Sequence, residues 1–297
     1  MSACLIIGMG YSAAAITRLL VAHMSVSATI RRPVNKEKVE ALGARPVMFD
    51  GESASIELAG ALATATHLLI SAPPGASGDP LLLHHRPDVL AAPRLCWIGY
   101  LSTVGVYGDH DGRWVEETTM PHPASARARQ RLAAEAQWRQ LAQERGTPLQ
   151  LFRLGGIYGP GRNTLVALAD ASQRRIVKPG QVFNRIHVQD IAGMVRAGMA
   201  YPLAGPVLNG VDDEPAPPQD VVAYAAMLMG RDPPPAIALE EAGLSPMGLS
   251  FYAENKRVSN RATKAQLAYR LLYPTYREGL AALAAARDWE QTPPPYA

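Results

Sequence analysis

The sequence is short of cysteine and of net charge, and each shortage excludes a class of protein. Its two cysteines, Cys4 and Cys96, are too few for a disulfide scaffold, and each lies in an apolar run typical of a strand. We therefore expect buried, reduced thiols and a reducing compartment. The formal net charge is only +3 over 297 residues, with no polybasic tail, so we expect no nucleic-acid partner.

Long apolar runs and several common catalytic motifs are also missing. Gly8 and Gly10 interrupt the first apolar stretch too early for a signal peptide or a membrane helix, so we expect a soluble, cytoplasmic protein with no membrane partner. The seven histidines show no metal-ligand spacing, and we predict no metal site. No Gly-x-Ser-x-Gly elbow or P-loop occurs, so acyl transfer and nucleotide hydrolysis lack their signatures.

The residues that are present can form a large core, because 48% are hydrophobic and 19% are charged. Apolar, strand-like runs alternate with stretches long enough for helices. This alternation predicts an α/β fold with a Rossmann-type, doubly wound parallel sheet. The predicted strands are Ala3–Ile7, Ser27–Ile30, Pro46–Phe49, His67–Ser71, Leu95–Tyr100 and Leu149–Leu154. The strongest helix signal is Ala124–Glu144, which follows the fifth strand.

The pattern loosens in the second half of the chain, where proline-rich turns separate shorter helices. We expect residues 1–160 to form the dinucleotide-binding domain. Residues 161–297 would mainly form a small C-terminal α+β lobe for the substrate, with some segments returning to the sheet. The last residues, Thr292 to Ala297, contain three successive prolines and are expected to form a loose tail.

A glycine pattern between the first strand and the first helix predicts a dinucleotide site. The segment from Gly8 to Ala13 reads Gly-Met-Gly-Tyr-Ser-Ala and matches G-x-G-x-x-G/A in its usual strand-to-helix context. Gly8 would form the tight turn, and Gly10 would let a pyrophosphate approach the helix N-terminus. A glycine-rich turn without a ligand is the alternative. The predicted cofactor-binding residues here are Gly8, Gly10, Tyr11, Ser12, Ala13, Ser71 and Ala72.

The end of the second predicted strand favours NADP over NAD. A site for NAD usually has an acidic residue there to bind the ribose hydroxyls, but this chain has Arg31 and Arg32. Two guanidinium groups would attract a 2′-phosphate. Both arginines could instead be solvent-facing loop residues. Asp50, after the third strand, is a candidate partner for adenine, although a turn-forming aspartate would look the same.

Four further motifs, in order along nearly the whole chain, resemble those of one enzyme family. They are Tyr100–Asp109, Arg153–Arg162, Arg185–Asp190 and Lys256–Asn260. The first contains Ser-Thr-Val-Gly-Val-Tyr-Gly, which strongly resembles the Ser-Ser/Thr-x-x-Val-Tyr-Gly signature of the extended short-chain dehydrogenase/reductases, the epimerase/dehydratase family. The resemblance implies a hydride-transfer site in which a Ser or Thr, a Tyr and a Lys surround the nicotinamide.

The chain keeps one part of that catalytic set and loses another. Thr103 matches the Ser/Thr position, with Ser102 beside it, although such a pair can also satisfy local backbone groups. The Tyr-x-x-x-Lys pair is replaced by Arg127 and Arg131. An arginine stays protonated near pH 7, so Arg127 cannot relay a proton. We assign Arg131 to the cofactor and Arg127 to an anionic substrate, with a solvated basic helix face as the alternative.

Loss of the tyrosine resembles the atypical members of the family and leaves two functional hypotheses. The first is an NAD(P)-dependent oxidoreductase or epimerase-like enzyme for a small polar, anionic or nucleotide-linked substrate. In that case Tyr107 or Tyr158 is the candidate acid, unless both are packing residues, and His187 is a candidate substrate contact. The second is a non-catalytic dinucleotide-binding regulator. The family habit suggests a homodimer through the helix at 124–144.

Overall fold

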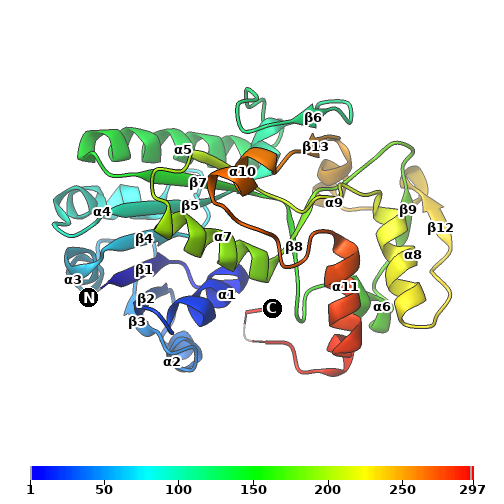
Figure 1. Cartoon of the computed structure of the whole chain (residues 1–297), viewed down its shortest axis with the longest axis horizontal. Helices are drawn as coiled ribbons and strands as arrows, with labels where there is room; N and C mark the ends of the chain where they lie inside the picture. Colours follow the sequence, from blue (N-terminus) through cyan, green and yellow to red (C-terminus); the bar gives the residue numbers. More distant parts are fainter. Residues whose placement is uncertain (1, 295) are drawn as a thin grey trace.

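Seven parallel strands form the central sheet of the protein. The computed structural model describes residues 2–294 and 296–297. The strand order is β11-β7-β5-β4-β1-β2-β3, so the chain changes direction across the sheet between β1 and β4 (Figure 1). Ligands of such sheets bind at this switch point, beyond the carboxyl ends of the strands. The strands are β1 (Ala3–Ile7), β2 (Ser25–Ile30), β3 (Arg45–Met48), β4 (His67–Ile70), β5 (Trp97–Thr103), β7 (Leu149–Leu154) and β11 (Val207–Gly210).

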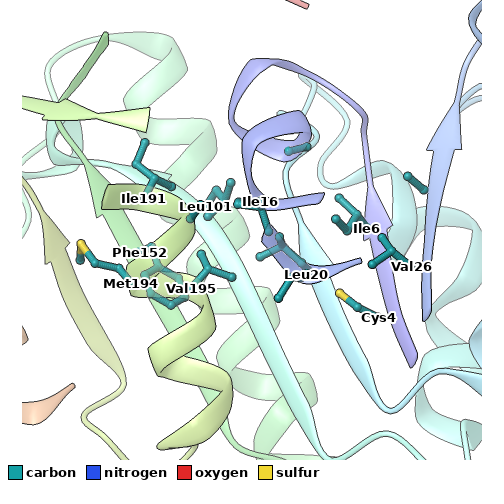
Figure 2. Packing of buried hydrophobic residues seen from close by; sticks show 14 of the residues in the cluster. Cys4, Ile6, Ile16, Leu20, Val26, Leu101, Phe152, Ile191, Met194 and Val195 are labelled. Carbon is teal, nitrogen blue, oxygen red and sulfur yellow. The ribbon is translucent and has the colours of Figure 1, made fainter. Parts of the chain in front are cut away.

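Helices cover both faces of this sheet, which confirms the predicted doubly wound fold. One face packs against α1 (Tyr11–Leu20), α2 (Lys36–Glu40) and α7 (Val188–Ala200). The other packs against α3 (Ile56–Thr64), α4 (Pro80–Ala91) and α5 (Ala126–Arg145). Figure 2 shows Leu20 of α1 beside Ile6 and Val26, and Val195 of α7 beside Phe152, within one apolar cluster on this face. Because both faces of the strands are buried, their sequences are nearly continuous apolar runs.

All six predicted strands are present, with ends shifted by three residues at most. Ala3–Ile7 and Leu149–Leu154 are the observed limits of β1 and β7. The prediction missed β11, which has four residues and pairs with β7 at the edge of the sheet. Its length and its Asn-Gly ending gave no strand signal. Pairing with an existing strand compensates for that weak local preference.

A second group of elements caps the sheet. It contains β8 (Gly156–Tyr158), α6 (Thr164–Ala169), β9 (Arg175–Val177), β10 (Arg185–His187), α8 (Pro218–Leu228), β12 (Ala236–Ala238), α9 (Pro246–Tyr252) and α11 (Tyr276–Ala285). Strands β8 and β10 form one parallel pair and β9 and β12 another. Tyr158, Leu165, Val221, Tyr276 and Leu280 belong to the apolar core of this capping lobe. Helix α7 and strand β11, which lie within the same part of the sequence, pack in the main sheet.

A short linking unit joins the two parts. Strand β6 (Trp114–Val115) pairs with β13 (Arg257–Val258), and α10 (Arg261–Gln266) follows β13. Val115, Val211 and Val258 form a small buried cluster with Tyr107 at this junction. No helix within the described residues is both long and apolar enough to cross a lipid bilayer.

The sequence predicted two buried cysteines, and this is right for Cys4 but wrong for Cys96. Cys4 is buried as predicted, and burial raises the pKa of its thiol to about 12. Cys96, however, precedes β5 and is exposed, although its neighbours Leu95 and Trp97 are both buried.

The end of the chain is not a loose tail where it is described; residue 295 lies outside the described residues. Gly161 has no side chain, and Pro293, Pro294 and Ala297 pack so closely on it that a Cβ there would lie within 3.1 Å of each of them. Tyr296 packs against the core cluster on the α1 side of the sheet.

Candidate functional site

The turn between β1 and α1 is built around Gly8. Its φ of +90° lies in the left-handed region that side chains rarely adopt, and a Cβ would lie within 2.9 Å of the backbone of Ala72. The Gly8 N–H donates to Thr29 Oγ1 at 2.7 Å, which ties the turn to β2. Glycine therefore lets the turn sit directly on the carboxyl end of β4, at the switch point of the sheet.

The start of α1 is open. Gly10 is the N-cap residue, no side chain caps the helix, and no acidic residue lies in the first turn. A Cβ on Gly10 would find no heavy atom within 4 Å, so there is free space in front of the helix. The first N–H groups of a helix have no partner within it and carry its positive dipole end. This space can accept a phosphate group, and the fully buried Ala13 lets α1 pack closely on the sheet.

The other predicted residues of this site have different local roles. The backbone N–H groups of Ser71 and Ala72 both donate to the Ile7 carbonyl, so they position the turn and offer no free donor. Ser12 is buried. The Tyr11 hydroxyl donates to the Pro160 carbonyl at 3.0 Å, which holds the loop after β8 beside α1.

The ends of β2 and β3 present charged side chains to solvent. Arg31 and Arg32 directly follow β2 and are exposed, and neither forms an ion pair with any described residue. They remain available for an anion. Asp50 follows β3, and its Oδ1 accepts hydrogen bonds from the N–H groups of Glu52 and Ser53. These bonds lower the pKa of the Asp50 carboxyl, and they are the turn contacts that the sequence left open as an alternative.

Ser102 is not available to a substrate, which corrects its assignment as a catalytic residue. The side chain is buried, and its hydroxyl donates to Glu135 Oε1 at 2.6 Å. Glu135 is itself buried on α5 and accepts two hydrogen bonds from Arg153, at 3.1 and 2.7 Å. Ser102 therefore belongs to a buried ionic network that holds α5 on β5 and β7. Sequence reasoning missed this network because its members are far apart in the chain.

Thr103 keeps a free donor at the carboxyl end of β5. It is half-buried, and its Oγ1 accepts a hydrogen bond from the Gly105 N–H at 3.1 Å. That contact caps the short helical turn Val104–Tyr107 and uses only a lone pair of the hydroxyl. The hydroxyl proton can still be donated to a substrate oxygen.

Tyr107 is a packing residue, and this corrects its assignment as the acid. It is completely buried, its hydroxyl donates to Asn209 Oδ1 at 2.7 Å, and the Arg153 guanidinium lies over its ring.

Tyr158 is also buried, with its hydroxyl against α11, where a Cβ on Gly279 would lie 2.1 Å from it. Burial strongly raises the pKa of Tyr158, with Asp212 contributing. Such a phenol is a weaker acid than an exposed tyrosine, which argues against the acid role.

The two arginines that replace Tyr and Lys lie in different environments. Arg127 is exposed, and its Nη1 contacts Met247 Sδ of α9 at 3.9 Å, so it links α5 to the capping lobe. Arg131 is half-buried, donates to the Leu101 carbonyl and lies over the Tyr100 ring. Its guanidinium is therefore anchored to β5. Neither residue is a simple solvated charge, and neither can act as a general acid or base.

His187 is not placed to contact a substrate directly. Its side chain is 2% exposed and lies between the rings of Tyr158 and Tyr273. Its Nδ1 accepts a hydrogen bond from the Gln189 N–H, which caps α7. Burial lowers the pKa of His187 to about 4, so the ring is neutral at pH 7. Its role is to start α7, which corrects the expected substrate contact.

One contact that the sequence did not assign joins the helix start to the capping lobe. The Arg162 guanidinium lies 5.6 Å from the centre of the Tyr11 ring. Arg162 ends the motif that begins at Arg153, so a signal was present, but nothing in the motif indicated its partner. Through this contact the loop after β8 lies next to the first residue of α1.

Comparisons with known proteins agree with this fold. No protein-family model matches the chain. The curated protein YeeZ of Escherichia coli K12 is 30% identical over 193 residues, which cover 59% of this chain and 63% of YeeZ. A functionally unknown conserved protein from Silicibacter pomeroyi DSS is 47% identical, with a TM-score of 0.87 and coverage of 97% of this chain and 99% of that one.

More distant structures share the fold alone. The UDP-glucose 4-epimerase of Thermus thermophilus, solved with NAD, is 19% identical with a TM-score of 0.71, covering 98% of this chain and 99% of that one. The human epimerase family protein SDR39U1, solved with NADPH, is 18% identical with a TM-score of 0.71, covering 95% and 99%. The chain thus belongs to one family with the Silicibacter protein, and it shares its fold with these epimerase structures.

Proposed function

We propose that this protein binds a nicotinamide dinucleotide at the start of α1 and acts as an NAD(P)-dependent oxidoreductase or epimerase-like enzyme. The observation that carries the proposal is the open, uncapped start of α1 behind Gly10. Proteins of the same fold have been solved with NAD and with NADPH. A small polar substrate would lie between the sheet and the capping lobe.

The residues at the end of β5 support the chemistry only in part. A bound dinucleotide would accept or supply a hydride. The Thr103 hydroxyl would donate a hydrogen bond to the substrate oxygen on which charge develops. Arg127 would attract an anionic substrate without exchanging a proton. Because a positioned general acid or base contributes about 10²–10⁴-fold to rate, we expect turnover slower than in relatives that keep the tyrosine.

The test of cofactor binding uses Gly10→Ala. The φ of Gly10 is −133°, which any residue can adopt, and a Cβ there touches nothing in the protein. The variant should therefore keep its stability but lose at least about tenfold in dinucleotide affinity by calorimetry, since the methyl group fills the phosphate space. Gly60→Ala, on α3 and also with free space around it, is the matched control and should bind normally. Equal affinities in the two variants would exclude the proposed site.

The choice between cofactors rests on Arg31 and Arg32. We infer a preference for NADP, because both guanidinium groups follow β2, are exposed and lack an ion pair with a described residue. Arg31→Ala and Arg32→Ala should each weaken NADP and leave NAD nearly unchanged. Tighter binding of NAD than of NADP by the unmodified protein would overturn this preference.

The competing proposal is a non-catalytic dinucleotide-binding regulator. It is favoured because residues at the expected catalytic positions contact other protein groups. Ser102 donates a hydrogen bond to Glu135, and Arg127 contacts Met247. Turnover of NADPH with carbonyl compounds or nucleotide sugars, lost in Thr103→Val, would support the enzyme. Tight dinucleotide binding with no turnover on that panel would support the regulator.

Homodimerisation through α5 stays a prediction, to be measured by light scattering.

A further inference from the structure

The capping lobe contains a cavity of about 230 Å³ that the proposed hydride-transfer site does not use. Its walls come from β8, β10, α8, α11 and the loop after β8. Ile157, Val221 and Leu280 supply apolar surface, while Arg162 and Arg185 supply two positive charges. The remaining lining residues are Tyr158, Asn163, Thr164, Gln173 and Tyr276. No carboxylate lines the cavity among the described residues, so its charge is positive.

Arg185 is the more enclosed of the two cations. It forms no ion pair within the part of the chain that the structure describes. Its Nη1 donates to the carbonyls of Phe183 and Ala216, at 3.0 and 3.1 Å, and these neutral acceptors leave the charge in place. Burial lowers the pKa of Arg185, which shows the cost of keeping the cation there. Buried charges in proteins are normally paired with an opposite charge or with a ligand.

The acidic residue whose charge acts on Arg185 is Asp212. Asp212 is 2% exposed and follows β11, and it makes no ion pair with the guanidinium. Its Oδ1 accepts from the Glu214 N–H, while its Oδ2 is buried without a hydrogen-bond partner. Burial raises the pKa of this carboxyl well above its usual value, although the charge of Arg185 acts in the opposite direction. The guanidinium thus has Asp212 as a neighbouring charge without a direct ion pair, and its hydrogen bonds to the protein are made by Nη1 alone among the described residues.

We propose that this cavity is a binding site for a small organic anion, with a carboxylate held by Arg185 and an apolar or aromatic body against Val221, Leu280 and Ile157. A planar guanidinium matches a carboxylate geometrically. The volume lies below the roughly 300–1,000 Å³ of pockets for drug-sized ligands, so the ligand is small. Arg162 stands at the exposed side, where it would meet an entering anion.

The site is separate from the start of α1 but adjoins it through one side chain. Arg162 lines the cavity and also lies over the Tyr11 ring. Anion binding needs no dinucleotide, so the inference can fail or hold independently of the proposed function. An anion that draws Arg162 toward the cavity would alter the contact with Tyr11, and the two ligands would then influence each other's affinity.

The experiment measures binding of benzoate to the full chain by calorimetry, at constant ionic strength and without dinucleotide. Cyclohexanecarboxylate and inorganic phosphate are titrated in the same way. We expect both carboxylates to bind and to raise the Tm of the protein, because a ligand that binds only the folded state stabilises it. Phosphate, which has no apolar body, should bind more weakly than either carboxylate.

Two variants test the two halves of the site. Arg185→Gln removes the charge and keeps hydrogen-bond donors, and it should weaken benzoate by at least about tenfold. Val221→Phe fills the cavity from α8 without touching a charge and should have a similar effect. Arg261→Gln, at the exposed start of α10, removes the same charge elsewhere and is the matched control.

Binding that is lost in Arg185→Gln and Val221→Phe but kept in Arg261→Gln would establish the site, provided that both variants still unfold cooperatively. If only one of the two variants folds, the benzoate affinity of that variant decides whether the site exists. The inference is overturned if neither carboxylate binds the unmodified protein, or if a folded variant binds benzoate as the unmodified protein does. Dinucleotide affinity, measured on the same samples, separates this result from a failure of the site at Gly10.

Discussion

Two helix starts at the same edge of the sheet behave in opposite ways. The N-cap residue of helix α1 is Gly10, which has no capping side chain and has open space around its Cβ position. The N-cap residue of helix α5 is Ser125, whose hydroxyl accepts a hydrogen bond from the Ala128 N–H at 3.2 Å, and the first turns of α5 are tied to β5 by Arg131. The first helix start has no side-chain cap, whereas in the second a serine hydroxyl binds one of the helix N–H groups. A motif in the sequence therefore does not by itself show whether its residues are free to bind a ligand.

The largest expected effect tests how firmly α5 is held. Glu135→Ala would leave the buried Arg153 without its partner, and breaking such a pair costs about 3–5 kcal/mol of unfolding free energy. Glu144→Ala removes an exposed pair with Arg86 near the other end of α5 and should cost less than about 1 kcal/mol. Urea denaturation measures both. Similar losses would mean that the middle of α5, at Glu135, is no more firmly held than its end.

A third helix start, at His187, adds a dependence on pH. The pKa of His187 is about 4 in the folded protein and near its ordinary value of 6.5 in the unfolded chain. Between these values the unfolded state binds more protons, so stability is complete above about pH 6.5 and is lost as the pH falls toward 4. The loss is about 3 kcal/mol for this shift.

The variant that isolates this effect is His187→Asn. The asparagine amide can still accept from the Gln189 N–H and cap α7, but it does not titrate. Unfolding free energies measured between pH 4 and 7 should therefore vary less in the variant than in the unmodified protein. Parallel pH profiles would show that His187 carries no such shift.

The next effect compares the two caps directly. Ser125→Ala removes the hydroxyl that caps α5 and should lower stability by about 1 kcal/mol without changing dinucleotide affinity. A change in affinity larger than threefold would mean that the start of α5 also contacts the cofactor. Thermal unfolding and calorimetry give the two quantities.

The smallest expected change in stability comes from closing α1 in the same manner. Gly10→Ser supplies the missing cap and should raise stability by a few tenths, about 0.3 kcal/mol. The same serine should weaken the dinucleotide, because its side chain enters the space in front of the helix. A more stable protein with unchanged affinity would show that this space is not the ligand site, and the contrast between the two helix starts would lose its functional meaning.

The strands, the fingerprint and the missing tyrosine could be predicted from the sequence because each depends on residues that are neighbours in the chain. Apolar runs buried on both faces indicated six of the seven main strands, and Gly8 and Gly10 indicated the turn that the structure contains. The replacement of Tyr and Lys by Arg127 and Arg131 needed only a count along one helix.

Only the tertiary structure decided which side chains remain free. Ser102 meets Glu135 across 33 residues, and the Tyr107 hydroxyl meets Asn209 across 102. These partners approach each other because the parallel strands bring distant segments to one edge, and no local pattern encodes such pairing. For the same reason, the unpaired charge of Arg185 became visible only when β10, α8 and α11 enclosed it.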